Sequence, residues 1–289
     1  MANENMVTST NGFVDAIGKD FSTVYATINP IKTPTLTYII ERNGVNVATD
    51  TIIQRVLKTL SKTGASGGKA EGAEAGAAEK STKTPVKNVL EIFSKVAMVA
   101  GTAKAMSKGA FDEEVTDRIA EIKEDINYNA INGTYSEGAN RSMKGMLNFA
   151  KHSVAVADVL TEAELDEAIQ KVETKGHLVL AVSNADIFKV QGNLIGDRAT
   201  LQLSADSTTA GVKIWNYNSA QGDVIEIYTE PALPAGTCML YDIDKVEYYE
   251  LRPVHFEELD KSGDYDRAQC IGEVTVLPNP GSIVKLAKG

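Results

Sequence analysis

One long amphipathic pattern, between residues 111 and 132, constrains this chain most. Apolar side chains recur there every three or four positions, which places them on one face of an α-helix. The face consists of Phe111, Val115, Ile119, Ile122, Ile126 and Ala130. At ~1.5 Å per residue this helix spans roughly 30 Å. A surface of similar length, built elsewhere in the chain, must therefore cover the apolar stripe.

The two ends of the pattern support this prediction. Residues 112–114 are three consecutive carboxylates, and negative charge in the first turn interacts favourably with the helix dipole. Gly133 follows the pattern, and glycine is common directly after a helix. We therefore expect the helix to end at this glycine.

Charge and cysteine usage exclude several classes of protein. The 289 residues carry a net charge of -10, which disfavours sequence-specific nucleic-acid binding because that needs cationic patches. A shell that merely surrounds nucleic acid is still compatible with this charge.

Cys238 and Cys270 have no metal or redox spacing, so we expect reduced thiols. The first residues lack a signal-peptide pattern, and no apolar run reaches the ~18 residues of a membrane span, so no membrane contact is expected.

The first 60 residues contain no pattern that predicts an independent core. Residues 1–44 are polar with scattered apolar side chains, and Pro30 and Pro34 predict extended backbone. We interpret this stretch as an arm that lies on another surface. Residues 45–60 fit two alternatives, because Val45 and Val47 alternate like a strand whereas the apolar residues from 52 to 60 have helical spacing.

Residues 61–88 differ sharply in composition from the rest of the chain. They contain five Gly, six Ala and five Lys, and Val86 is their one large apolar residue. Such a segment buries too little surface to offset the entropy lost on ordering. It is either a flexible linker or a loop that becomes ordered only against a neighbouring subunit.

The remaining sequence mixes helical and strand patterns and predicts an α+β fold. Val89 to Ala100 is strand-like, and residues 161–164 form a capping box that begins a helix closed by Gly176. A buried strand at 177–183, a short helix at 185–190 and strands at 212–215 and 223–229 predict an α+β lobe at about 155–235. Four strand-like runs then follow, at 238–241, 245–256, 272–277 and 283–286. Pro253 suggests an edge position or a bend in the second of these runs.

Three segments carry a resemblance to a known family. Residues 88–102 read NVLEIFSKVAMVAGT, the long helix follows them, and residues 251–276 read LRPVHFEELDKSGDYDRAQCIGEVTV. All three resemble segments of tailed-phage major capsid proteins. The first is similar to the family's N-Y-x-Q-I-F-S-K and V-S-G-T motifs, and the long helix is similar to its spine helix. The third is similar to its L-R-P-F, L-A-K-T-G-D and E-x-T motifs. That family has the Hong Kong 97 fold, and the SU10-type major head proteins are the most similar. Val89 and Glu91 depart from the family's tyrosine and glutamine.

The resemblance implies an architecture and a set of partners. It implies an N-terminal arm at 1–44, an extended loop at 45–90, a peripheral domain with the spine helix at 91–154, an axial domain at 155–235, and return strands of the peripheral domain at 236–289. Copies of the chain would form pentamers and hexamers of an icosahedral virion head, assembled in the host cytoplasm. The shell would enclose double-stranded DNA without sequence-specific binding. Portal, scaffolding and decoration proteins are the other partners it implies.

Within this architecture two groups of residues are candidate functional residues. Loop contacts with a neighbouring subunit are expected from Lys69, Glu71, Gly72, Lys80 and Lys83. The core face of the spine helix is expected from Phe111, Val115, Ile119, Ile122 and Ile126. Some relatives of this fold join a loop lysine to an asparagine by an isopeptide bond; we favour the alternative that Lys69, Lys80 and Lys83 keep the loop soluble.

A search for chemical motifs predicts no enzyme, metal or cofactor. The sequence has no phosphate-binding loop and no H-E-x-x-H motif, and its histidines at 152, 177 and 255 are scattered. Three hypotheses follow: a phage capsid subunit, an encapsulin-like cellular nanocompartment of the same fold, and a ligand-binding or enzymatic module. We favour the capsid subunit.

Overall fold

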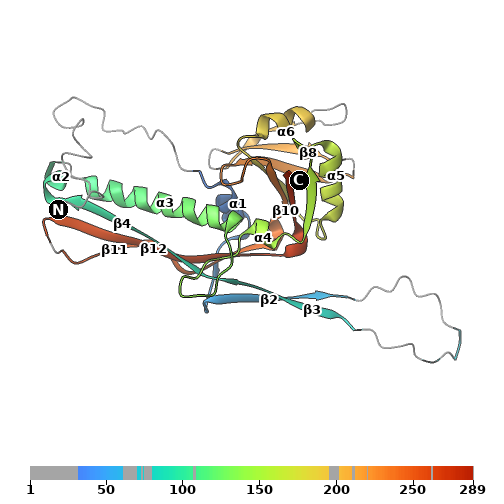
Figure 1. Ribbon diagram of the computed structural model, residues 1–289, viewed down its shortest axis with the longest axis horizontal. Helices are drawn as coiled ribbons and strands as arrows, with labels where there is room; N and C mark the ends of the chain where they lie inside the picture. Colours follow the sequence, from blue (N-terminus) through green and yellow to red (C-terminus); the bar gives the residue numbers. More distant parts are fainter. Residues whose placement is uncertain are drawn as a thin grey trace.

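The computed structural model has an elongated body with a hairpin that points away from it (Figure 1). It describes residues 32–60, 70–72, 74, 80–106, 109–194, 202–209, 212–219, 221–261 and 263–288. Two sheets form the body, and a third sheet of two strands forms the hairpin. Within the described residues, no helix is both long and apolar enough to cross a membrane.

One end of the body is a narrow four-stranded sheet covered by the long helix. The sheet order is β1-β11-β12-β4. Its strands are β1 (Asn46–Val47), β4 (Glu91–Ala100), β11 (Val246–Glu258) and β12 (Tyr265–Pro278). The short helix α2 (Gly101–Met106) follows β4, and α3 (Ala110–Asn132) then runs back along β4 and β12 (Figure 1). The helix expected at 111–132 is therefore present and lies on β4, which shortly precedes it in the sequence, and on the distant strand β12.

The sequence pattern of α3 explains how it packs. Phe111, Val115, Ile122 and Ile126 are buried, whereas Ile119 is partly buried against the same core. On the sheet side, β4 contributes alternate buried residues such as Phe93 and Ala97, as expected when one face of a strand is covered. This interface forms the hydrophobic core at that end of the body.

The other end of the body is a seven-stranded sheet with both faces covered. Its order is β5-β13-β10-β6-β9-β8-β7. Its strands are β5 (His152–Val156), β6 (Leu178–Ser183), β7 (Gln202–Thr209), β8 (Val212–Asn218), β9 (Val224–Glu230), β10 (Thr237–Asp242) and β13 (Ile283–Lys288). Alternate residues of β6 join two cores: Val179 and Ala181 belong to the core shared with α3, and Leu180 belongs to a second core. The second core includes buried residues of α5 (Glu162–Lys171) and α6 (Ile187–Leu194).

Short elements join the two ends of the body and begin the hairpin. Helix α1 (Pro34–Asn43) contacts α3, β9 and β11. Helix α4 (Met146–Phe149) contacts α3 and β13. Single 3-10 turns occur at Ile243–Lys245 and Pro280–Ser282. The hairpin consists of β2 (Ile52–Thr59) and β3 (Thr82–Val89), paired antiparallel.

The end of α3 depends on a close approach of two chain segments. Gly133 has a φ of -51°, so its backbone is not left-handed. A Cβ atom at Gly133 would lie 2.4 Å from the Met143 carbonyl oxygen and 2.5 Å from that of Asn129. The helix therefore ends at Gly133 as expected, and this position requires glycine because the segment that carries Met143 passes too close for any side chain.

Several sequence predictions are wrong, and each error has a physical reason. Pro34 does not extend the chain; it occupies the first turn of α1, where its missing N–H is no loss. The helical alternative for 52–60 is wrong, because β3 pairs with that stretch. Residues 82–88 of the Gly/Ala/Lys segment are strand rather than linker. Helix α5 ends at Lys171, and Gly176 instead donates its N–H to the Asp242 carboxylate at 3.0 Å.

Other predictions are confirmed or refined. Thr161 and Glu164 form the capping box, with Thr161 N–H donating to the Glu164 carboxylate at 2.8 Å. Strand β11 shifts register on both sides of Arg252, next to Pro253. After residue 235, β11 and β12 lie in the four-stranded sheet, but β10 and β13 lie in the seven-stranded sheet. A lobe limited to 155–235 therefore does not describe the chain, because its sheet needs β10, β13 and β5.

The packing of α3 can be tested with two substitutions on opposite faces. Ile122→Ala should lower the free energy of unfolding by about 2–5 kcal/mol, because Ile122 is fully buried and the truncation leaves a cavity. Glu124→Ala should change it by less than ~0.5 kcal/mol, because Glu124 is exposed. Urea unfolding of the unassembled chain measures both values. Equal destabilisation by the two changes would contradict this orientation of α3.

Candidate functional site

The hairpin of β2 and β3 projects from the body of the molecule (Figure 1). Strands β2 and β3 pair from Ile52 opposite Val89 to Thr59 opposite Thr82, and no third strand joins them among the described residues. An isolated two-stranded hairpin is marginally stable in water. Its position must therefore depend on contacts with the body at its base or with another molecule along its length.

Asn88 fixes the base of the hairpin. Its side-chain amide donates to the carbonyl oxygens of Val276 at 2.6 Å and Lys144 at 3.0 Å. Its side-chain oxygen accepts from the Lys144 N–H at 2.8 Å. Asn88 is fully buried, so these bonds are costly to leave unmade. One side chain thus joins β3, β12 and the chain that leads into α4.

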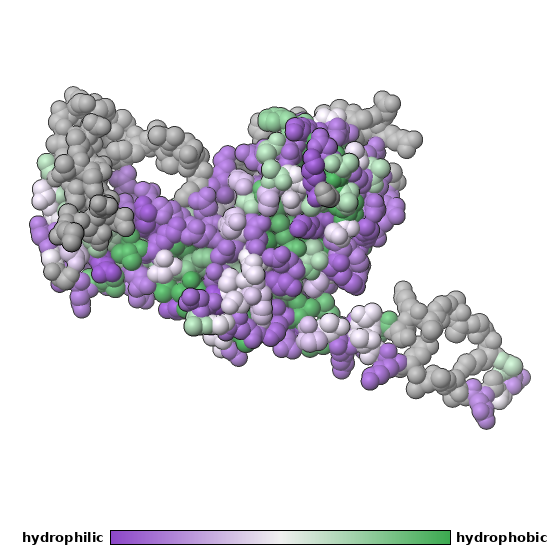
Figure 2. All heavy atoms as spheres, in the orientation of Figure 1, coloured by the Kyte–Doolittle hydropathy of each residue, from purple (hydrophilic) through white to green (hydrophobic). Residues whose placement is uncertain are grey.

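Apolar and ionic contacts support this base on its inner face. Val86 is buried, and Ile53 and Leu57 pack partly buried against the core that contains α3. Arg55 forms an ion pair with Glu247 of β11. Figure 2 shows the hairpin leaving the body with both hydrophilic and hydrophobic side chains on its surface. The exposed apolar residues there include Ile52, Val56 and Leu60.

The charges of the hairpin strands are all of one sign. Strands β2 and β3 contain four cationic residues and no carboxylate. Lys58 lies directly opposite Lys83, and like charges at such a position destabilise a strand pair. Neither lysine forms an ion pair with any described residue. An anionic surface brought to this point would remove the repulsion.

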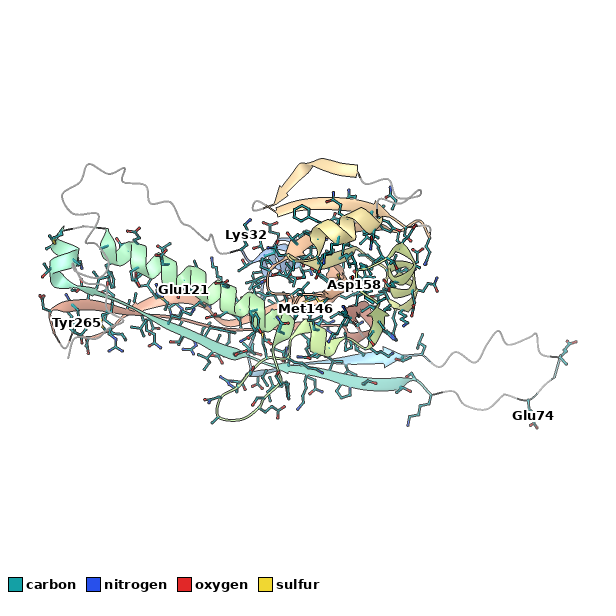
Figure 3. All side chains as sticks on the ribbon, turned by 45° about the horizontal axis from the view of Figure 1, so that its top comes forward. Lys32, Glu74, Glu121, Met146, Asp158 and Tyr265 are labelled. Carbon is teal, nitrogen blue, oxygen red and sulfur yellow. The ribbon has the colours of Figure 1, made fainter. Side chains whose placement is uncertain are left out.

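Helix α3 presents the opposite charge. It contains seven carboxylates and two cationic residues. Glu114, Glu121 and Asp125 form ion pairs with Arg118 or Lys95. Four exposed carboxylates have no ion pair within the described part of the chain; they are Asp112, Glu113, Asp117 and Glu124. In Figure 3, Glu121 lies on α3 while Glu74 lies at the far end of the hairpin loop.

A buried carboxylate holds helix α1 between the two ends of the body. Glu230, at the end of β9, is fully buried. It accepts from the Thr35 N–H at 3.0 Å, the Thr35 hydroxyl, the Asn127 amide at 2.9 Å and the Ala232 N–H at 3.0 Å. The Asn127 oxygen accepts from the Leu36 N–H at 3.0 Å. The first free N–H groups of α1 are therefore satisfied by side chains from β9 and α3.

Glu91 makes a second such connection. Its carboxylate accepts from the Asn129 side chain of α3 and from the Met143 N–H, both at 3.0 Å. Burial raises the pKa of this carboxyl group. The family that this chain resembles has glutamine at the position of Glu91. A carboxylate can accept both hydrogen bonds with either oxygen, whereas a glutamine side chain also carries an NH2 group that can only donate.

The residues predicted for loop contacts lie far from the body or on the hairpin. Lys69 lies outside the described residues. Glu71, Gly72 and Lys80 are exposed, with Gly72 at a φ of 83° in the left-handed region. Lys83 is exposed on β3. The sequence analysis did not identify Lys58, Asn88, Asn127 or Glu230 as functional or structural residues. The one local signal was for Lys58, because β2 and β3 contain cationic residues and no carboxylate.

The described residues contain no group of side chains that could hold a metal ion. The three histidines are apart, each beside one glutamate: His152 by Glu173, His177 by Glu226 and His255 by Glu257. Cys238 and Cys270 are buried free thiols. Burial raises the pKa of Cys238 to about 12, which disfavours the reactive thiolate.

Comparison with known proteins gives one match over nearly the whole chain. A family model described as the SU10 major capsid protein matches residues 3–282. No curated protein sequence matches this chain.

Solved structures share the fold at low sequence identity. The capsid of the native GTA particle matches with a TM-score of 0.68 and 13% identity, over 97% of this chain and 98% of that one. The capsid of cyanophage A-1(L) gives 0.68 and 13%, over 94% and 97%. The SrpI encapsulin complex of Synechococcus elongatus gives 0.64 and 11%, over 92% of each chain. The Hong Kong 97-type α+β fold expected from the sequence is confirmed.

The role of Glu230 can be tested through pH. Burial raises the pKa of Glu230 above its value in the unfolded chain, so the folded state binds a proton more readily. The free energy of unfolding should therefore fall, relative to that of Glu230→Gln, as the pH rises from about 4.3, the ordinary pKa of glutamate, through the raised pKa. Urea unfolding of both proteins across this range measures the difference. A relative stability that rises with pH would mean that the four donors outweigh burial.

Proposed function

This chain belongs to the SU10 major capsid protein family, and from that premise we propose that its copies build the icosahedral head shell around the double-stranded DNA of a tailed phage. As a capsid component it forms shells from many copies and resides in the virion. Its role in the proposal is structural rather than catalytic. Assembly in the host cytoplasm, and contacts with portal, scaffolding and decoration proteins, belong to the proposal as well.

The proposal assigns a role to each part of the molecule. Residues 1–44 act as the arm, and β2, β3 and the residues between them act as the extended loop. Helix α3 is the spine of the peripheral domain, together with the four-stranded sheet. The seven-stranded sheet with α5 and α6 is the axial domain. Lys69, Glu71, Gly72, Lys80 and Lys83 contact a neighbouring subunit without covalent cross-linking.

The observation that carries the assembly proposal is the unbalanced charge of the hairpin. Lys58 and Lys83 repel one another within one chain, and exposed apolar residues lie beside them at Val56 and Leu60. A second copy supplies the opposite charge for the two lysines, because four exposed carboxylates of its α3 form no ion pair with any described residue. A cationic hairpin that docks on an acidic surface of the next copy is a head-to-tail contact, and contacts of this kind form a ring when the rotation between copies closes. Many such modest contacts hold a shell together.

One alternative has structural support. An encapsulin shares the fold over most of both chains, so a cellular nanocompartment with a protein cargo is the second candidate. The family match favours the phage capsid. Shells isolated from the native source would contain double-stranded DNA in the first case and a protein cargo in the second.

The assembly proposal can be tested by charge reversal on the hairpin. The purified chain should form closed, hollow shells in electron microscopy. Lys58→Glu combined with Lys83→Glu should abolish shells and leave circular dichroism unchanged, because both side chains are exposed and neither forms an ion pair with a described residue. Lys189→Glu is the matched control: Lys189 is an exposed cation of α6, outside the hairpin and α3, so this variant should still form shells.

Shells from the double variant at moderate salt would contradict the electrostatic contact. A wild-type chain that stays monomeric at high concentration would contradict assembly itself.

A further inference from the structure

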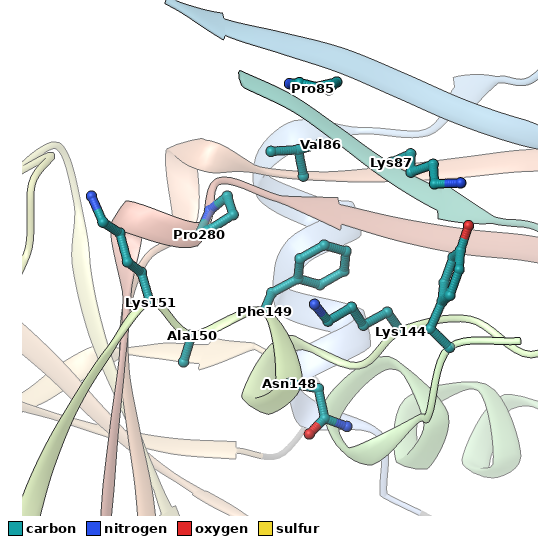
Figure 4. Close-up of a pocket in the computed structure, with 10 residues that line it drawn as sticks. Pro85, Val86, Lys87, Lys144, Asn148, Phe149, Ala150, Lys151 and Pro280 are labelled. Carbon is teal, nitrogen blue, oxygen red and sulfur yellow. The ribbon is translucent and has the colours of Figure 1, made fainter. Parts of the chain in front are cut away.

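A cavity of about 530 Å³ lies at the base of the hairpin, apart from its exposed cationic face. Its lining combines two prolines and an aromatic floor with three lysines (Figure 4). The residues that matter to its chemistry are Pro85, Lys87, Lys144, Phe149, Lys151 and Pro280. Its volume falls within the roughly 300–1,000 Å³ range of ligand sites. We term this cavity the Lys144 pocket.

Two of its three lysines are already neutralised. Lys87 forms an ion pair with Glu137, and Lys151 forms one with Glu173. Each lysine holds the pKa of its glutamate partner below the usual value. Lys144 has no carboxylate partner within the described ranges; its ammonium lies 4.6 Å from the centre of the Phe149 ring. The pocket therefore has one uncompensated cation beside an apolar surface.

The geometry around Lys144 is fixed from both sides. Its N–H donates to Asn88 and its carbonyl accepts from Asn88, so the backbone that carries the ammonium is held by a buried side chain. Phe149 and Val86 are both buried and line the cavity. Strand β3 pairs with β2 on one edge, and Pro85, Val86 and Lys87 of β3 line the cavity in sequence. An aromatic group with an adjacent carboxylate, carried on an extended chain, fits such a pocket.

We propose that the Lys144 pocket binds the N-terminal arm of a second copy of this chain, through residues 13–21. The proposal rests on the shell assembly proposed above. The segment reads FVDAIGKDF and lies outside the described residues. It places an aromatic ring next to or near a carboxylate twice, as Phe13 with Asp15 and as Phe21 with Asp20. The carboxylate pairs with the Lys144 ammonium, and the ring packs on the Phe149 and proline surface.

Composition favours the arm over the acidic hairpin loop as the occupant. The hairpin loop carries Glu71 and Glu74, but the residues around them are alanine and glycine. Such a loop could neutralise Lys144 but would leave the apolar floor uncovered. The arm offers both groups within three residues.

Zero-length cross-linking tests the proposal directly. Copies labelled with nitrogen-15 are mixed with unlabelled copies, assembled, confirmed as shells by electron microscopy, and treated with a carbodiimide, which joins a carboxylate to a lysine amine. Mass spectrometry should find Lys144 joined to Asp15 or Asp20 in peptides of mixed label, which identifies a contact between copies. Lys144→Gln should abolish this cross-link, and Lys189→Gln, at an exposed lysine of α6, should leave it unchanged. Lys144→Gln keeps the backbone bonds to Asn88, so its fold is expected to survive.

The outcomes separate the two proposals. Three results in assembled shells would overturn the arm contact and leave shell assembly standing. Lys144 could form no cross-link, it could be joined to Glu71 or Glu74, or it could be joined to the arm of its own copy. Failure of the wild-type chain to form shells would overturn the proposed function first. A mixed-label Lys144 cross-link to the arm that survives Asp15→Asn with Asp20→Asn would also contradict the proposal.

Discussion

The packing of α3 on the four-stranded sheet is the interaction on which the rest of the structure depends. Its apolar stripe gives a narrow sheet a core along its whole length, and its last turns reach the junction with the seven-stranded sheet. There Asn127 binds α1, Asn129 binds Glu91 and the Asn132 side chain donates to the Ala232 carbonyl at 2.7 Å. A long thin body is stable because one helix both covers a sheet and holds the neighbouring segments at its end.

The sequence predicted those elements whose structure follows from local periodicity. Helix α3, the capping box at Thr161 and the strands β4, β6 and β9 all have their pattern within a short window. Helix α1 and strand β3 do not. Thr35 finds its cap in Glu230, 195 residues away, and β3 owes its strand to pairing with β2 and to Asn88, which binds Val276 188 residues away. Composition alone made β3 resemble a linker.

The candidate site shows the same division. Lys80 and Lys83 were predicted to contact a neighbouring subunit, and the structure shows that both are exposed, with Lys83 on strand β3. The significance of Lys83 became clear only from its register opposite Lys58, because charge repulsion across a strand pair requires both positions. The Lys144 pocket likewise combines residues from β3, the chain before α4, and the turn after β12, which no sequence window brings together.

The strand order has a consequence for how the chain folds. Strand β13 lies between β5 and β10 in the seven-stranded sheet, and β12 lies between β11 and β4 in the other. Each sheet therefore lacks an internal strand until residues beyond 264 have been synthesised. Pairings between such distant segments form slowly. A nascent chain that ends before β12 cannot complete either sheet, so synthesis of most of the chain precedes the folded state that associates with other copies.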